Sequence, residues 1–230
     1  MLHRRHDKLI TILVPCRSRH ERTLSLLRSI EKNTDDTSRV RVITITDFDQ
    51  TEDHNNIARL VNSGEITYEL LNITRTRDVQ LNRNYYNLAN LMGESYFCWI
   101  LGNDIEVETD GWDTILYEAV KDSLTLIQSD EQNYYILIDD DTHTSNGKYE
   151  EYGSCFPIIS NNYCEKIRGP MPEYKNAWGG DIELYKNCRS DVENWEFIHL
   201  ENDIKISHYC IHNGKAVADE VNINVKNNEN

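Results

Sequence analysis

One short stretch, residues 96–108, constrains the fold of this chain more than any other. It begins with six apolar or aromatic residues, Tyr96–Leu101, and contains no charge over that run. Such a run is typical of a strand buried on both faces. It stops at Gly102–Glu106 (G-N-D-I-E), so the strand carries two carboxylates to its C-terminal end. Ligands of open α/β sheets bind there, and oxygen ligands suit Mg²⁺ or Mn²⁺ beside a phosphate. A solvated acidic turn is the alternative.

The segments before this strand alternate between strand and helix patterns. Leu9–Val14 and Val40–Thr46 are apolar and β-branched, and each is followed by apolar residues at helical spacing, within residues 24–30 and 52–62. Ile66–Leu71 is a third predicted strand. The order β-α-β-α-β predicts a parallel sheet with right-handed crossovers. Later helices are predicted at 79–92, 112–119, 161–167 and 180–189, and later strands at 134–138, 155–159, 197–200 and 204–211.

The chain is long enough for one domain with a sizeable core. It has 230 residues, of which 39% are hydrophobic, and a chain of this size buries most of its apolar surface in one unit. We expect the domain to span residues 1–217, because residues 218–230 are polar, rich in asparagine and typical of a flexible tail. The acidic, turn-rich residues 139–153 are predicted to form a surface loop or mobile lid.

The charge of the chain is strongly negative but unevenly distributed. The net charge is −15, while residues 1–41 hold ten Lys and Arg against five acids, and residues 101–160 hold two against fourteen. The first segment therefore carries +5 and the second −12. A surface this acidic repels phosphates, which argues against non-specific binding to nucleic acid or anionic membranes. The phosphates of a nucleotide would be accommodated beside the basic N-terminal segment.

Cysteine usage and hydropathy indicate the compartment. The six cysteines form no C-x-x-C pair, and Cys98 lies inside the apolar strand. Neither a zinc ribbon nor a disulfide framework is indicated, so we expect reduced thiols in a cytoplasmic protein. The first apolar run, Leu9–Pro15, is too short for a signal peptide or a membrane span. Since no other segment approaches the roughly 18 apolar residues of a span, we expect a soluble protein.

Two groups of polar residues follow the first two predicted strands. Pro15–Arg19 (P-C-R-S-R) leads to Arg22, and arginine offers a planar fork of donors matched to phosphate. Asp47 and Asp49 follow the second strand, where a carboxylate accepts hydrogen bonds from a base or a ribose hydroxyl. A solvated basic turn and turn-forming aspartates are the alternatives. The sequence contains neither G-x-G-x-x-G nor G-x-x-x-x-G-K-[ST], so it lacks the glycine-based phosphate loops.

Two further groups lie in the last quarter of the chain. Trp178–Leu184 (W-G-G-D-I-E-L) places two glycines between an aromatic ring and an acid, which permits close approach of a ligand to the backbone. Asp181 opens a predicted helix and has the chemistry of a general base, although a helix cap is the alternative. His208 and His212 fall on one side of a predicted strand, where either could complete metal coordination begun by Asp104. A hydrogen-bonded structural histidine is the other interpretation.

Taken in order, these four groups resemble the motifs of GT-A-fold nucleotide-sugar glycosyltransferases, particularly of the family 2 type. Val14–Arg22 (V-P-C-R-S-R-H-E-R) and Leu26–Ile30 (L-L-R-S-I) are similar to the opening V-P-x-[RY]-[NR]-x-x-E and L-L-x-S-[IL] of that family. Gly102–Asp104 stands where the family has D-x-D, and Trp178–Leu184 stands where it has W-G-E-D-x-E-L. The resemblance covers about residues 9–215, nearly the whole chain.

The sequence departs from these motifs at two glycines. Gly102 replaces the first Asp of D-x-D, which leaves Asp104 as the clear metal carboxylate and Glu106 or Asn103 as possible helpers. Gly180 replaces the Glu of W-G-E-D, while Asp181 falls on the position that the resemblance assigns to the catalytic base.

The resemblance implies a fold and an activity. The fold is α/β of the GT-A, Rossmann-like type, with a mostly parallel central sheet flanked by helices and a smaller mixed C-terminal part that binds the acceptor. Residues 9–107 would form the nucleotide-sugar half and residues 108–217 the acceptor half. The activity is transfer of a sugar, of the hexosyltransferase type, from a nucleoside-diphosphate sugar to an acceptor hydroxyl with inversion. The implied cofactor is Mn²⁺ or Mg²⁺.

The resemblance also implies a role for each site residue. Asp181 is the catalytic base, and the other residues bind the donor, the substrate or the metal. The nucleotide-binding residues are Pro15, Cys16, Arg17, Arg19, Asp47, Asp49, Asn84, Asn103 and Asp104; the substrate-binding residues are Trp178, Gly179, Gly180 and Glu183; the metal ligands are Asp104 and His212, with Glu106 and His208 as competitors.

Two other classes of protein share parts of this pattern. A nucleotidyltransferase has a similar nucleotide-binding α/β plan, and a non-catalytic nucleotide- or carbohydrate-binding module would tolerate the incomplete D-x-D motif. The acceptor is left open between a polysaccharide, a protein, a small molecule and a hydroxylated nucleic-acid base. The sequence specifies neither the sugar and its nucleotide nor the oligomeric state.

Overall fold

The structure is a computed structural model that describes residues 7–16, 19–75, 95–143, 147–166 and 180–209. Strands and helices alternate along most of this length. The strands are β1 (Lys8–Cys16), β2 (Val40–Asp47), β3 (Glu69–Arg75), β4 (Ser95–Ile100), β5 (Ile105–Val107), β6 (Asn133–Asp139), β7 (Ile158–Ser160) and β8 (Trp195–His208). The helices are α1 (His20–Asn33), the short 3-10 helix η1 (Thr37–Arg39), α2 (Thr51–Ser63), α4 (Trp112–Val120), α5 (Leu124–Gln128), α6 (Tyr149–Tyr152), α7 (Asn161–Lys166) and α8 (Gly180–Ser190).

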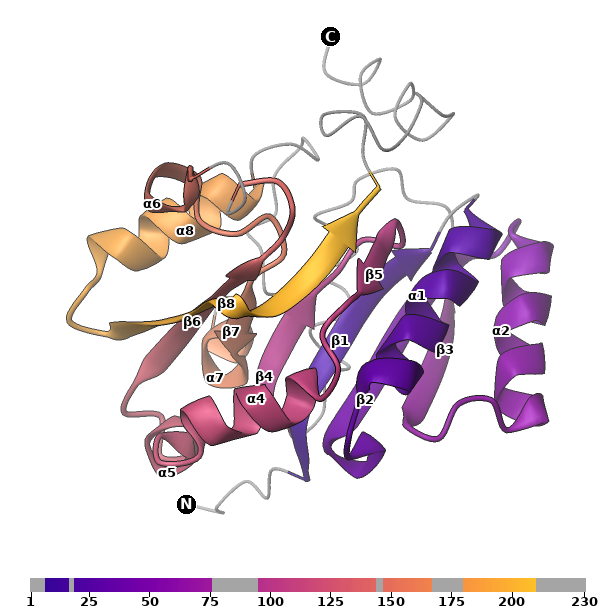
Figure 1. Cartoon of the computed structure of the whole chain (residues 1–230), viewed down its shortest axis with the longest axis horizontal. Coiled ribbons are helices and arrows are strands. Elements are labelled where there is room, and N and C mark those ends of the chain that lie inside the picture. Colours follow the sequence, from indigo (N-terminus) through magenta and orange to yellow (C-terminus); the bar gives the residue numbers. More distant parts are fainter. Residues whose placement is uncertain (1–6, 17–18, 76–94, 144–146, 167–179, 210–230) are drawn as a thin grey trace, which may run out of the picture.

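These strands form one eight-stranded sheet with the order β3-β2-β1-β4-β7-β6-β8-β5 (Figure 1). β1 pairs in parallel with β2 and β4, and β2 pairs in parallel with β3, as the β-α-β order predicts. β6 and β8 are also parallel to each other. β7 is antiparallel to β4 and β6, and β5 is antiparallel to β8. The predicted α/β fold with a mostly parallel sheet and a mixed C-terminal part is therefore confirmed.

β4 is buried on both faces, as its apolar sequence predicts. Phe97 and Trp99 belong to the core cluster on one face, and Cys98 and Ile100 belong to the cluster on the other. All four side chains are fully buried. An ionised side chain inside this strand would lose its hydration without gaining a partner. The first carboxylate therefore appears only after the strand has ended.

Helices cover both faces of the sheet. The helices α1, α2, α4 and α5 pack on the face that contains Trp99, and Figure 1 shows α1, α2 and α4 on the near side. The helices α7 and α8 pack on the face that contains Ile100. None of the described helices combines the length and apolarity that crossing a membrane requires.

The strands β3, β7 and β8 differ from the sequence prediction, and β5 was not predicted. β7 spans Ile158–Ser160, whereas residues 155–159 were predicted. β3 spans Glu69–Arg75, whereas residues 66–71 were predicted. Ile66 and Tyr68 are buried in the core like strand residues, but they precede the strand. β8 is one strand of 14 residues where two strands were predicted. The first part of β8 pairs with β6 and its last part pairs with β5. These pairings keep both predicted strands extended as one continuous strand. A register irregularity between Ile138 and Asp139 accompanies this change of partner.

The described residues of the acidic segment, 139–143 and 147–153, are not all at the surface. They include the short helix α6, and Asp140 is fully buried among them. The prediction of a surface loop or mobile lid is therefore wrong for Asp140, whose carboxylate accepts hydrogen bonds from backbone N–H groups. The helix predicted at 79–92 lies outside the described residues.

A buried carboxylate joins α4 to the end of α1. Asp113 is fully buried, and its two oxygens accept hydrogen bonds from the backbone N–H groups of Asp35 at 2.7 Å and Asp36 at 3.0 Å. Beside it, the indole Nε1–H of Trp112 donates to Thr34 Oγ1 at 3.0 Å. The turn after α1 is thus fixed to the first turn of α4.

Replacing this carboxylate should destabilise the fold. Asp113→Ala leaves two backbone N–H groups without their acceptor, and we expect the free energy of unfolding to fall by about 2–4 kcal/mol. Urea denaturation measures this change. The matched control is Asp122→Ala, since Asp122 is exposed, and its effect should stay within about 0.5 kcal/mol. Equal effects of the two substitutions would contradict the assignment.

Candidate active site

The candidate site lies at the edge of the sheet where the parallel strands end. β1 and β2 are in register at this edge, with Cys16 opposite Thr46, and β4 runs parallel to β1 on its other side. The loops that leave the three strands therefore start side by side, which is where open α/β sheets bind ligands.

An ion pair joins the loop after β1 to the loop after β4. Arg19 Nη1 donates to Asp104 Oδ2 at 2.5 Å. The two side chains are 10% and 14% exposed, so the pair is largely shielded from water. A charge-assisted bond of this kind fixes the carboxylate in one orientation. The structure thus brings together two of the residues that the sequence assigned to nucleotide binding.

His208 lies on the other side of the same carboxylate. Its Nε2 is 3.9 Å from Asp104 Oδ1, and its Nδ1 forms a hydrogen bond of 3.0 Å with Thr142 Oγ1. The imidazole ring also contacts the edge of Phe156, with 4.8 Å between ring centroids. Burial lowers the pKa of His208, although Asp104 opposes this shift. The imidazole is therefore neutral at pH 7, which is the form that binds metals.

Gly102 leaves room for the Asp104 carboxylate. A Cβ atom on Gly102 would lie 2.6 Å from Asp104 Oδ1 and 3.5 Å from a ring carbon of Phe156. A side chain at position 102 and the present orientation of Asp104 therefore exclude each other. The glycine in the D-x-D-like motif is compatible with one well-placed carboxylate, held between Arg19 and His208.

Tyr209 holds the loop after β4 in place. Its N–H donates to the Asp104 carbonyl at 2.9 Å, and its hydroxyl donates to Glu106 Oε2 at 3.1 Å. Arg22 Nη1 donates to the Tyr209 carbonyl at 2.9 Å. The other oxygen of Glu106 accepts a hydrogen bond from Ser25. Glu106, a predicted competitor for the metal, is thus engaged by α1 and Tyr209.

The other predicted nucleotide-binding residues lie at the ends of β1, β2 and β4. Pro15 and Cys16 are buried at the end of β1. Asp47 is fully buried at the end of β2, whereas Asp49 is exposed in the turn that follows. Asn103 is buried, and its amide donates to Thr23 on α1 at 3.2 Å, which anchors the loop that carries Asp104.

The helix α8 begins with the predicted general base. Gly180 is buried, Asp181 is partly buried and Glu183 is exposed. Burial raises the pKa of the Asp181 carboxyl, and it is opposed by the nearby His143 and reinforced by Asp140. A carboxylate whose pKa is raised is a stronger base, as proton abstraction from a hydroxyl requires.

A chain of contacts connects Asp104 to the start of α8. Thr142 bonds His208 through its hydroxyl, and its backbone N–H donates to Asp140 Oδ1 at 2.9 Å. Asp140 in turn lies close enough to Asp181 to influence its ionisation. The ends of β4, β6 and β8 and the start of α8 therefore meet in one polar region.

Sequence reasoning missed the contribution of β6 to this region. Thr142 and His143 follow β6 directly, in the run Asp139–His143 (D-D-D-T-H). β6 ends at the same edge as β4, because both are antiparallel to β7. The rule that singled out Asp47 and Asp104, polar residues just after an apolar strand, also applies here. The signal was present but was interpreted as a loop.

Several predicted site residues lie outside the described part of the chain. They are Arg17, Asn84, Trp178, Gly179 and His212. Their assigned roles remain predictions from the sequence.

The residues around Asp104 fit a divalent cation. Metal–oxygen and metal–nitrogen distances of about 2.1 Å allow one ion to bridge two ligand atoms up to roughly 4.2 Å apart. Asp104 Oδ1 and His208 Nε2 are 3.9 Å apart. The histidine is neutral and the carboxylate oxygen faces it, so both can act as ligands.

Comparison with known proteins identifies the fold. No protein-family model matches the sequence, and no curated protein matches it either. Among solved structures, the chain is similar to the mannosyltransferase PcManGT from Pyrobaculum calidifontis in complex with GDP-Man and Mn²⁺, with a TM-score of 0.64 and 11% identity. This match covers 87% of this chain and 56% of that one. The chain has the GT-A fold of nucleotide-sugar glycosyltransferases.

A second solved protein supports the same fold. TarS residues 1–349 from S. aureus, in complex with UDP-GlcNAc, match with a TM-score of 0.60 and 13% identity. This match covers 94% of this chain and 64% of that one. The chain thus spans a little more than half to about two-thirds of the solved structures that it resembles.

Proposed function

We propose that the chain is a glycosyltransferase that moves a sugar from a nucleoside-diphosphate sugar to an acceptor hydroxyl. The observation that carries the proposal is the group formed by Arg19, Asp104 and His208 at the ligand edge of a GT-A sheet. Asp181, at the start of α8, is linked to this group through Asp140 and Thr142. Similar structures contain GDP-Man with Mn²⁺ or UDP-GlcNAc, which supports a donor of this chemical class.

The donor would lie across the ends of β1, β2 and β4. Asp47 is the residue proposed to accept hydrogen bonds from the nucleoside, with Pro15 forming part of the floor. Arg19 is proposed to donate to the diphosphate, and the position of its planar guanidinium, held at the ligand edge by Asp104, supports this role.

Asp104 is proposed to hold a divalent cation, Mn²⁺ or Mg²⁺, together with His208 or His212. His208 is the histidine that lies beside Asp104 in the described part of the chain. When bound, such a cation neutralises charge on a departing diphosphate. Arg19 contributes to the same charge compensation from the other side of the carboxylate.

Asp181 is proposed to act as the general base. It would accept the proton of the acceptor hydroxyl as the hydroxyl oxygen forms a bond to the anomeric carbon of the sugar. The bond between that carbon and the diphosphate oxygen breaks, and the nucleoside diphosphate leaves with the electron pair. Attack from the face opposite the leaving group inverts the configuration. The raised pKa of the Asp181 carboxyl supports this role, since it makes the carboxylate more basic.

Removing the base should abolish turnover but preserve binding. For Asp181→Asn we expect release of nucleoside diphosphate from a panel of UDP- and GDP-sugars to fall at least about 100-fold, as loss of a general base implies. Affinity for the nucleoside diphosphate, measured by calorimetry, should be unchanged. Turnover is measured by chromatography of the released nucleotide.

The control for this substitution is Glu193→Gln. Glu193 is exposed beyond the end of α8, so its replacement should leave both turnover and affinity as in the wild type. Wild-type turnover in Asp181→Asn would refute the assigned role. Release of pyrophosphate instead of a nucleoside diphosphate would identify a nucleotidyltransferase, and binding without any turnover would identify a non-catalytic module.

Metal removal tests the role of Asp104. We expect nucleoside diphosphate to raise the melting temperature of the wild type more strongly with Mn²⁺ than with EDTA. Asp104→Ala should eliminate the metal-dependent part of the shift, because the remaining imidazole is a single ligand. Donor turnover should fall in parallel with the loss of binding.

Asp110→Asn is the matched control for Asp104. Asp110 is an exposed acid six residues further along the chain, and its replacement should preserve the response to Mn²⁺. Undiminished turnover of the wild type in EDTA would show that Arg19 and Asp104 act without a cation.

A further inference from the structure

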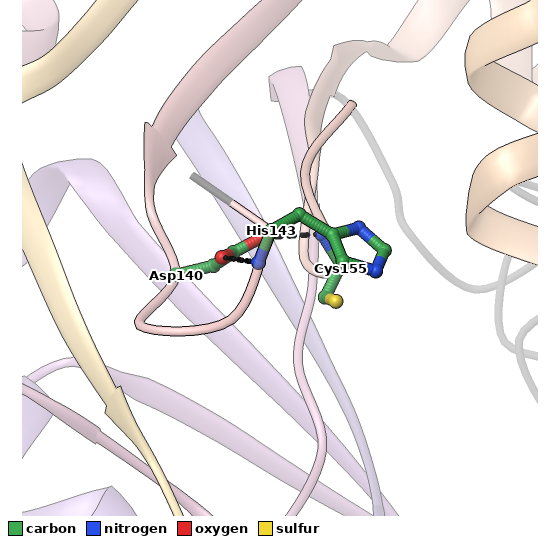
Figure 2. Close-up of side chains that lie close together, drawn as sticks. All are labelled: Asp140, His143 and Cys155. Atoms are coloured by element: carbon green, nitrogen blue, oxygen red, sulfur yellow. Dashed lines mark hydrogen bonds between the residues drawn. The ribbon is translucent and has the colours of Figure 1, made fainter. Parts of the chain in front are cut away.

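A second group of potential metal ligands lies next to the proposed active site. Asp140, His143 and Cys155 each offer one ligand atom, and these atoms all lie within 4.8 Å of one another. Asp140 follows β6, His143 lies three residues later, and Cys155 lies in the segment that leads into β7. Figure 2 shows the three side chains gathered between these two stretches of chain.

The Asp140 carboxylate is held in one orientation by its surroundings. It is fully buried, and its oxygens accept hydrogen bonds from the backbone N–H groups of Thr142 and His143 at 2.9 Å and of Cys155 at 2.5 Å. The Ser154 hydroxyl is a further donor, at 3.0 Å. The three backbone donors are fixed, whereas the hydroxyl can rotate and make room for a cation at the carboxylate. Hydrogen bonds of this kind orient the carboxylate ligands of metal sites.

The His143 ring carries a buried nitrogen that needs a partner. Its Nδ1 is buried and has no hydrogen-bond partner among the described residues. Burying a polar atom without a partner costs roughly 1–3 kcal/mol, so such an atom in a native protein calls for an unseen ligand. The backbone of His143 is bonded to Asp140, which keeps the ring beside the carboxylate.

Cys155 supplies the third ligand and the chemical selectivity. It is partly buried and forms no disulfide with another described cysteine. A thiolate, an imidazole and a carboxylate together suit zinc, whereas Mg²⁺ and Ca²⁺ prefer oxygen ligands alone. Three protein ligands leave one tetrahedral position for water.

We propose that Asp140, His143 and Cys155 form a Zn²⁺ site. Binding would release the Cys155 proton to solvent and place the thiolate on the metal. The ion would tie the loop after β6 to the segment before β7, which the Asp140 hydrogen bonds already join. The site is separate from Asp104, although Thr142 contacts both Asp140 and His208. The proposal does not depend on sugar transfer.

Cobalt substitution tests this site directly. The full chain is stripped of metal with a chelator, dialysed and titrated with Co²⁺. We expect a thiolate-to-cobalt charge-transfer absorption that saturates at one equivalent and disappears when Zn²⁺ is added. Cys155→Ser should remove this absorption. It should also weaken Zn²⁺ binding, measured against a chromophoric chelator, by more than about tenfold, since even loss of an outer partner costs about 10- to 100-fold.

Matched variants separate this site from the others. His143→Ala should weaken Zn²⁺ binding, whereas His199→Ala should not, because His199 is exposed and bonded to Glu201. Asp104→Ala should retain the cobalt absorption, because no thiolate is assigned to that site. Circular dichroism checks that each variant is folded. Absence of the absorption in the wild type, or its persistence in Cys155→Ser, would overturn the proposal.

Discussion

The structure depends on the burial of β4 on both of its faces. Trp99 shows how this strand organises its surroundings. Its ring packs against that of Trp112 on α4, with 5.0 Å between ring centroids, and its indole N–H donates to the Phe156 carbonyl at 3.1 Å. Inside such a strand an ionised group would lose its water without compensation. Charged residues are therefore confined to the strand ends, and because parallel strands end at one edge, that edge collects them. The candidate active site lies at this edge for this reason.

The edge is rich in acids. The negative charges of Asp104 and Asp140 are stabilised in different ways. Asp104 is paired with Arg19, whereas Asp140 is surrounded by backbone N–H groups and the Ser154 hydroxyl. The two arrangements favour different partners. Asp104 is proposed to hold Mn²⁺ or Mg²⁺ beside a diphosphate, while Asp140 with His143 and Cys155, which adds a thiolate, suits zinc. The contact of Thr142 with both groups makes them neighbours in space without merging them.

Much of the fold could be predicted from the sequence, because the spacing of apolar residues along the chain matches the pattern of burial in the structure. The doubly buried strand β4, the helices α1, α4 and α8 and the parallel pairing of β1 with β2 were all expected, with bounds that differ from the predicted ones by a few residues. The single long β8 was not, since its polar middle reads as a break between two strands. The burial of Asp140 was missed for a similar reason. Its sequence neighbours are acids and turn residues, and its hydrogen-bond donors include residues 14 and 15 positions away.

The sequence by itself determined which residue types stand at the ends of the strands, because apolar runs and their endpoints are local properties of the chain. It therefore placed Arg19, Asp47 and Asp104 at a common edge. Only the tertiary structure decided which of them meet. The Arg19–Asp104 pair spans 85 positions and the approach of His208 to Asp104 spans 104. Such pairings depend on strand order and register, which are set by packing across the whole sheet and leave no trace in local periodicity.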